Sequence, residues 1–148
     1  MQSLVFKNIL LIILGLMLFS CSQKAPKTKE AGIKKLTNVI EVIDFYTTHR
    51  CVTCIDIENN TKYTLDTYFK REVASHKIVY LTLNIDKKEN YKIAEKFQAI
   101  GSALFLNVIS KGKETHIDLT DFAFLKGSDK DIFVKELKSK IDDALKQL

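Results

Sequence analysis

The feature that most constrains this sequence is a pair of cysteines, Cys51 and Cys54, that stands between an apolar segment and a long polar one. The apolar segment, residues 39–46, is rich in β-branched residues and predicts a buried strand. The segment that follows predicts a helix from Cys51 to about Ala74. The first N–H groups of a helix lack internal partners and carry partial positive charge, so they stabilise a thiolate. We therefore expect a reactive dithiol where a strand passes into a helix.

The spacing of the two cysteines assigns them different tasks. Cys51 lies nearest the helix N-terminus and is the expected nucleophile, whereas Cys54, one turn further in, is the expected resolving thiol. A purely structural disulfide is the alternative. A bridge across so short a loop removes little entropy from the unfolded chain, so stability is a poor reason for it.

Metal and cofactor sites find little support in the sequence. A structural zinc site needs four ligands, and among the histidines only His49 lies near the cysteines. Haem attachment needs Cys-x-x-Cys-His, and Ile55 stands at the histidine position. We expect no resident cofactor, while a copper or zinc carrier that uses Cys51, Cys54 and His49 remains an alternative.

Two cationic side chains precede the first cysteine. Arg50 is adjacent to Cys51 and can lower the pKa of its thiol by proximity of charge, or it can be a solvated side chain. His49 can do the same when protonated, can shuttle a proton, or can be an ordinary surface histidine. Both residues are therefore candidates for tuning the dithiol.

The N-terminal residues resemble an export signal. Lys7 precedes an apolar run over 9–19, which has the length of a signal peptide. The run ends in Ser20-Cys21, which is similar to the bacterial lipoprotein signal, in which the cysteine is acylated and becomes the new N-terminus. An uncleaved anchor is the alternative, but so short a run makes a poor spanning helix. We expect a cleaved signal peptide over 1–20 and a lipid such as palmitate on Cys21.

A polar stretch over 21–35 contains the sole proline and no apolar period, so it predicts a flexible tether. The domain then spans residues 36–148, enough for one core. Its expected location is the periplasmic side of a bacterial membrane. The net charge of +5 is dispersed as lysines without a basic block, so we expect modest attraction to anionic lipid or acidic partners and no nucleic-acid partner. We also expect the chain to be a monomer.

The remaining segments alternate between strand and helix. Asp86 to Glu89 fits a capping box that would begin a helix to about Phe97. The other predicted elements are strands over 77–84, 103–109 and 114–119, a Gly-containing turn over 110–113, a phenylalanine-bearing loop, and a C-terminal helix capped within 128–131. The order β-α-β-α-β-β-α predicts an α/β fold, with a mixed central sheet and helices on both faces.

This order, with Cys-x-x-Cys at the end of the first strand, resembles the thioredoxin fold over the whole of 36–148. Arg50-Cys51-Val52-Thr53-Cys54 is moreover similar to exported thioredoxin-like proteins named as the nitrophenyl compound nitroreductase subunit family. The resemblance implies a membrane-tethered thiol–disulfide oxidoreductase that serves an exported partner. It also implies that Asp44 is a buried proton acceptor for the resolving thiol.

Two departures from the thioredoxin pattern favour a dedicated partner. Ala103 stands where thioredoxins carry a cis-proline, so a trans peptide is expected and the groove that grips substrate backbone is altered. The link from strand to motif, residues 47–50, is longer and lacks the usual tryptophan. The lost proline also motivates the alternative of a non-catalytic thioredoxin-like module that binds metal or docks a partner reductase.

Overall fold

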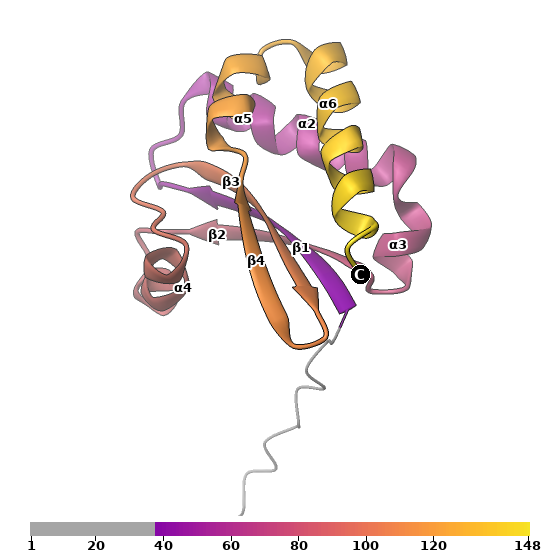
Figure 1. Cartoon of the computed structure of the whole chain (residues 1–148). Helices are drawn as coiled ribbons and strands as arrows, with labels where there is room; N and C mark the ends of the chain where they lie inside the picture. Colours follow the sequence, from indigo (N-terminus) through magenta and orange to yellow (C-terminus); the bar gives the residue numbers. More distant parts are fainter. Residues whose placement is uncertain (1–37) are drawn as a thin grey trace, which may run out of the picture. The chain divides into compact units, whose positions relative to one another are not determined.

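The structure, a computed structural model, describes residues 38–148 (Figure 1). The elements in chain order are β1 (Asn38–Tyr46), α2 (Val52–Tyr68), α3 (Lys70–Ala74), β2 (Ile78–Asn84), the 3₁₀ turn η1 (Lys88–Asn90), α4 (Tyr91–Lys96), β3 (Ala103–Ser110), β4 (Lys113–Asp118), α5 (Thr120–Lys126) and α6 (Lys130–Leu145). The predicted signal peptide, the tether and Cys21 lie outside the described residues. Within 38–148, none of the helices has the length and apolar character needed to span a bilayer.

The four strands form one mixed sheet in the order β2-β1-β3-β4. β1 is parallel to β2, with Tyr46 opposite Asn84, and antiparallel to β3, with Phe45 opposite Ala103. The parallel pair is joined by α2 and α3, and the antiparallel pair β3 and β4 forms a hairpin. The predicted α/β class and mixed sheet are confirmed.

Helices cover both faces of the sheet, as predicted (Figure 1). On one face α2, α5 and α6 pack against alternate residues of β1 and β3, and the central members of this core are Ile40, Val42, Ile57, Leu65, Leu106, Ala123, Phe133, Leu137 and Ile141. On the other face α4 closes a smaller core of Ile43, Phe45, Ala94, Phe97, Ala99 and Phe105. Because side chains alternate along a strand, residue 44 of β1 points toward the α2 face together with residues 40 and 42.

The hairpin between β3 and β4 has the predicted turn. Lys111 and Gly112 both have positive φ, 51° and 80°. Two successive left-handed residues make the turn whose twist matches that of the flanking strands, and glycine takes the second position without strain. Lys111 also donates its backbone N–H to Asn38 Oδ1 at 3.2 Å, which ties the turn to the start of β1.

The long first helix differs from its prediction. One helix was predicted from Cys51 to about Ala74, but the structure breaks it at Phe69, between α2 and α3, while the polar stretch Glu58–Lys62 is continuous helix. Tertiary contacts explain the continuity, because Asn60 is buried and donates its amide to Gly127 O at 2.9 Å. Of the apolar residues in its second half, Leu65 and Phe69 are buried, whereas Tyr68 and Val73 are exposed.

Two further local predictions are wrong. Asp86 caps no helix, since its carboxylate accepts the backbone N–H of Thr48 at 2.7 Å, and α4 begins only at Tyr91. The expected loop after β4 contains α5, which forms because Ala123 is fully buried against the main core. The C-terminal helix cap is confirmed, with Asp129 accepting the N–H of Ile132 at 3.1 Å.

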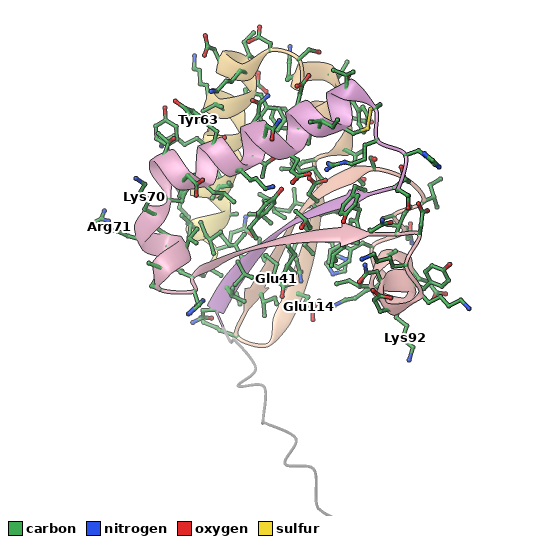
Figure 2. The ribbon with its side chains drawn as sticks, turned by 180° about the vertical axis from the view of Figure 1, so that it is seen from behind. Glu41, Tyr63, Lys70, Arg71, Lys92 and Glu114 are labelled. Carbon is green, nitrogen blue, oxygen red and sulfur yellow. A yellow bond between two sulfur atoms is a disulfide. The ribbon has the colours of Figure 1, made fainter. Side chains whose placement is uncertain are left out.

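Cationic side chains are dispersed over the domain, which agrees with the charge pattern of the sequence. Figure 2 shows Lys70 and Arg71 of α3 pointing outward at one side and Lys92 of α4 at the other. The acidic Glu41 and Glu114 lie on the sheet between them. Cations therefore lie on more than one side of the described domain.

The core makes a matched prediction about stability. Leu106 is fully buried on β3, whereas Leu125 on α5 is 77% exposed. Leu106→Ala should lower the free energy of unfolding by about 2–5 kcal/mol because it leaves a cavity, and Leu125→Ala should change it by less than about 0.5 kcal/mol. Denaturant unfolding of both variants measures the difference, and equal losses would contradict the assignment of the core.

Candidate functional site

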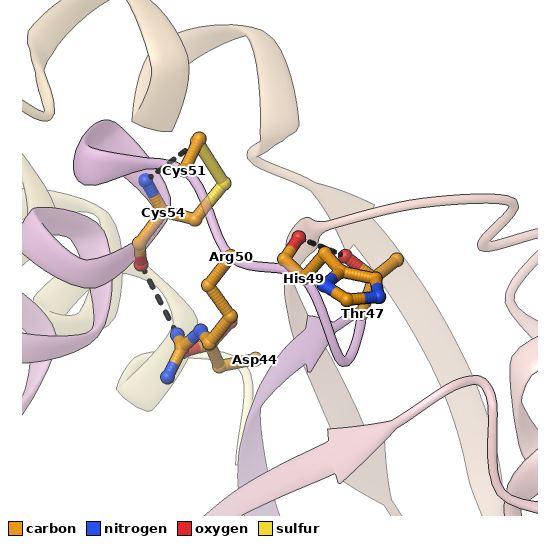
Figure 3. The surroundings of a disulfide bond; sticks show 6 residues. All are labelled: Asp44, Thr47, His49, Arg50, Cys51 and Cys54. Carbon is orange, nitrogen blue, oxygen red and sulfur yellow. Dashed lines mark hydrogen bonds and ion pairs between the residues drawn. A yellow bond between two sulfur atoms is a disulfide. The ribbon is translucent and has the colours of Figure 1, made fainter.

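The two cysteines form a disulfide at the N-terminus of α2 (Figure 3). Cys51 is the N-cap of the helix, with extended backbone, and its Sγ accepts the backbone N–H of Cys54 at 3.0 Å. The first turn of α2 carries no acidic residue that would oppose a thiolate. A sulfur at this position receives a helix N–H and the positive end of the helix dipole, which are the two factors that stabilise a thiolate.

The two sulfur-bearing residues differ in exposure. Cys51 is exposed, whereas Cys54 is only 7% exposed and belongs to the core. An external thiol or disulfide can therefore approach the first residue and not the second. The sequence predicted this order, with Cys51 outermost and Cys54 one turn in.

Arg50 organises the charges beneath the disulfide. Its Nη2 donates to the Cys54 carbonyl at 3.2 Å and lies 3.9 Å from Asp44 Oδ2, while its Nη1 pairs with Glu58. The guanidinium carbon also lies 4.7 Å from the centre of the Tyr46 ring. Arg50 is thus no freely solvated side chain, and it links the first turn of α2 to the end of β1.

Asp44 is buried on the α2 face of β1, with 3% exposure. Burial raises its pKa from the ordinary 3.8 to about 7, against the lowering effect of Arg50. Tyr80 donates its hydroxyl to Asp44 Oδ2 at 3.3 Å, and burial together with Asp44 raises the pKa of this phenol, so it remains a donor. The Asp44 carboxyl can therefore gain or lose a proton near neutral pH.

Three members of this network were missed in the sequence. Glu58 accepts from both Arg50 and Lys62, and although burial alone raises its pKa, these hydrogen bonds prevail and lower it. The i, i+4 spacing of Glu58 and Lys62 was a readable signal of that pair. No local sequence pattern indicated Tyr80, because it reaches Asp44 only through the parallel pairing of β1 and β2. In that pairing Tyr80 lies opposite Val42 and diagonal to Asp44.

His49 does not join the dithiol. It is exposed and points away from the disulfide, toward Thr47, whose hydroxyl donates to the His49 carbonyl at 2.9 Å (Figure 3). Of the residues that the sequence proposed for tuning the cysteines, the structure brings Asp44 and Arg50 together and leaves His49 outside. Among residues 38–148, no three or more His, Cys, Asp or Glu side chains gather closely enough to hold a metal ion.

Ala103 lies at the start of β3, at the end of β1 from which the chain enters the cysteine loop. It lines a groove of about 280 Å³ together with Gln98, Ala99, Ile100, Gly101, Ser102, Phe105, Asp118, Thr120 and Asp121. No peptide bond within 38–148 is cis. Ala103, expected at the cis-proline position of thioredoxins, therefore follows a trans peptide bond, as predicted, and lines this groove.

Comparisons with known proteins add little to this geometry. No protein-family model matches the sequence, and no curated protein matches it. Among solved structures, one described as that of a malarial protein is 19% identical, with a TM-score of 0.39, and the match covers 60% of this chain and 96% of that one. At that level the likeness carries no argument.

The raised pKa of Asp44 predicts a specific dependence of stability on pH. The folded state holds this proton more tightly than the unfolded chain, so the contribution is complete below about pH 4 and is lost as the pH rises through about 7. Relative to Asp44→Asn, the oxidised wild type should lose about 2–3 kcal/mol of unfolding free energy between pH 5 and 8. Denaturant titrations across this range test it, and parallel pH profiles for the two proteins would contradict it.

Proposed function

We propose that this chain is a thioredoxin-like thiol–disulfide oxidoreductase that exchanges disulfides with a dedicated exported protein. The observation that carries the proposal is the unequal pair at the N-terminus of α2: an exposed Cys51 that caps the helix and a buried Cys54 behind it. Such a pair suits attack by one sulfur and resolution by the other.

The fold context supports the same proposal. The strand order β2-β1-β3-β4, with β1 parallel to β2 and antiparallel to β3, agrees with the resemblance to the thioredoxin fold. The cysteines follow β1, one of the two central strands of this sheet, after the loop 47–50, and Ala103 begins β3, the other central strand. The rest of the proposal, a lipid on Cys21 and a periplasmic location, rests on the sequence of residues 1–21.

The exchange can be written with all atoms accounted for. The Cys51 thiolate attacks one sulfur of a partner disulfide, and the other partner sulfur leaves and takes a proton from water. Cys54 then gives its thiol proton to the ionised Asp44, and its thiolate attacks Cys51 Sγ. The Cys51–Cys54 bond forms, the bond to the partner breaks, and the second partner sulfur leaves as a thiolate. The partner disulfide has gained two electrons and the dithiol has lost two.

The buried Asp44 suits the proton transfer because both of its forms are populated near neutral pH. Desolvation otherwise makes deprotonation of a buried thiol such as Cys54 unfavourable. The reverse direction, oxidation of a partner dithiol, uses the same groups in the opposite order. The direction in the cell depends on the potential of the pair relative to its partners.

The first test is trapping of the partner. Cys54→Ser should accumulate a mixed disulfide through Cys51, visible as a mass increase on non-reducing electrophoresis that a thiol reductant removes. Cys51→Ser is the matched control and should trap little, because Cys54 is buried. Equal trapping by both variants, or trapping by neither, would argue against the roles assigned here.

The second test is the reduction potential of the Cys51–Cys54 pair, measured by alkylation in graded thiol buffers. An exchanging dithiol of this fold should have a value between about −270 and −120 mV. A value near the first limit would indicate a reductant, and one near the second an oxidant of exported thiols. A reduction potential below about −300 mV would indicate a structural bridge. The non-catalytic module would then replace this proposal.

A further inference from the structure

We propose that Glu58 is a positioning residue for the dithiol: it holds the Arg50 guanidinium on the first turn of α2 and off Asp44, which leaves Asp44 free to take up and release a proton. The inference deepens the proposed function and rests on it for its role in exchange. Its structural content, the control of Asp44 by Glu58 through Arg50, can be tested apart from any exchange.

The geometry shows a guanidinium shared unequally between two carboxylates. Its Nη1 is paired with Glu58, whereas its Nη2 lies 3.9 Å from Asp44 Oδ2, beyond hydrogen-bond distance. The same Nη2 donates instead to the Cys54 carbonyl at 3.2 Å. Arg50 therefore uses its charge-assisted bond on α2 and leaves the buried carboxylate of β1 without one.

A small displacement would reverse this preference. The distance from Nη2 to Asp44 needs to shorten by only about 1 Å to reach that of a charge-assisted hydrogen bond, about 2.8 Å. The guanidinium is also incompletely satisfied, because its buried Nε has no partner among the described residues. Without the Glu58 carboxylate, a direct ion pair with Asp44 becomes the best arrangement open to Arg50.

The groups that face Asp44 come from three elements and account for its environment. Tyr80 of β2 donates a hydroxyl, Arg50 approaches from the loop before α2, and Glu58 and Lys62 face it from α2. Lys62 is itself held by Glu58 in an i, i+4 pair. Glu58 thus binds both cations near Asp44, and its removal releases both at once.

The functional consequence concerns the resolution step described above. Asp44 must be ionised to accept the Cys54 proton and must be able to hold that proton afterwards. A direct pair with Arg50 would keep the carboxylate ionised and weaken its hold on the proton. Glu58 therefore preserves the proton exchange although it is bonded to neither Asp44 nor a sulfur.

The decisive experiment follows the Asp44 carboxyl carbon by ¹³C NMR in the oxidised full chain as the pH is varied. Wild type should titrate near neutral pH, and Glu58→Gln should move the inflection down by about one to three pH units, the range for a carboxyl beside an arginine. Glu58→Ala, which also removes the acceptor, should move it at least as far. Glu95→Gln on the exposed surface of α4 removes the same charge and should leave it in place.

A double-mutant cycle separates positioning from the direct field of Glu58, since loss of a nearby negative charge by itself also lowers the inflection. In an Arg50→Gln background the positioning effect is absent, so Glu58→Gln should produce less than half of the shift seen when Arg50 is present. Equal shifts in both backgrounds would overturn the proposal, as would an inflection that stays in place or rises in both Glu58→Gln and Glu58→Ala.

The pH profile of the dithiol gives the functional readout, with dithiothreitol as the exchange probe. The inflection in the pH dependence of the exchange rate should move together with the NMR inflection in the Glu58 variants. If the exchange-rate inflection stays in place while the NMR inflection moves, the role of Glu58 in exchange is overturned. If the chain shows no reversible exchange with dithiothreitol at all, the proposed function fails. The NMR cycle on the oxidised protein then still decides whether Glu58 positions Arg50.

Discussion

The burial of β1 on both of its faces is the constraint on which the remaining structure depends. β1 pairs with β2 on one side and β3 on the other, and its alternate residues enter two separate cores. With both faces and both edges occupied, the strand has no freedom to shift its register. The end of β1 therefore has a fixed position, and this position determines where the disulfide at the start of α2 lies.

The same burial raises the energetic cost of ionising a carboxyl group at the site. Asp44 lies on the face of β1 that α2 covers, so its carboxylate is separated from water and its charge is costly. Arg50 moderates that cost only in part, because it is bonded to Glu58 and to the Cys54 carbonyl. The result is a carboxyl group whose pKa is raised to about 7 and which Arg50 connects to the first turn of α2.

Local sequence signals failed where distant residues compete for the same groups. The capping motif at Asp86 was misleading because the parallel pairing of β1 and β2 brings Thr48 beside it. The Asp86 carboxylate accepts the backbone N–H of Thr48 and does not cap a helix. The polar centre of α2 stays helical because Asn60 finds a buried acceptor in Gly127, 67 residues away. Propensity and capping rules describe a helix in isolation, and in both places a tertiary hydrogen bond outweighed them.

The sequence by itself determined the order of the principal strands and helices, the mixed sheet, the hairpin turn and the place of the dithiol between a strand and a helix. These follow from periodicity, β-branched runs and glycine, which act over a few residues. Only the tertiary structure decided that Arg50 is shared among Asp44, Glu58 and Cys54, that Tyr80 completes the group, and that His49 stands apart. Such contacts depend on strand register and side-chain direction across elements, and no local pattern encodes them.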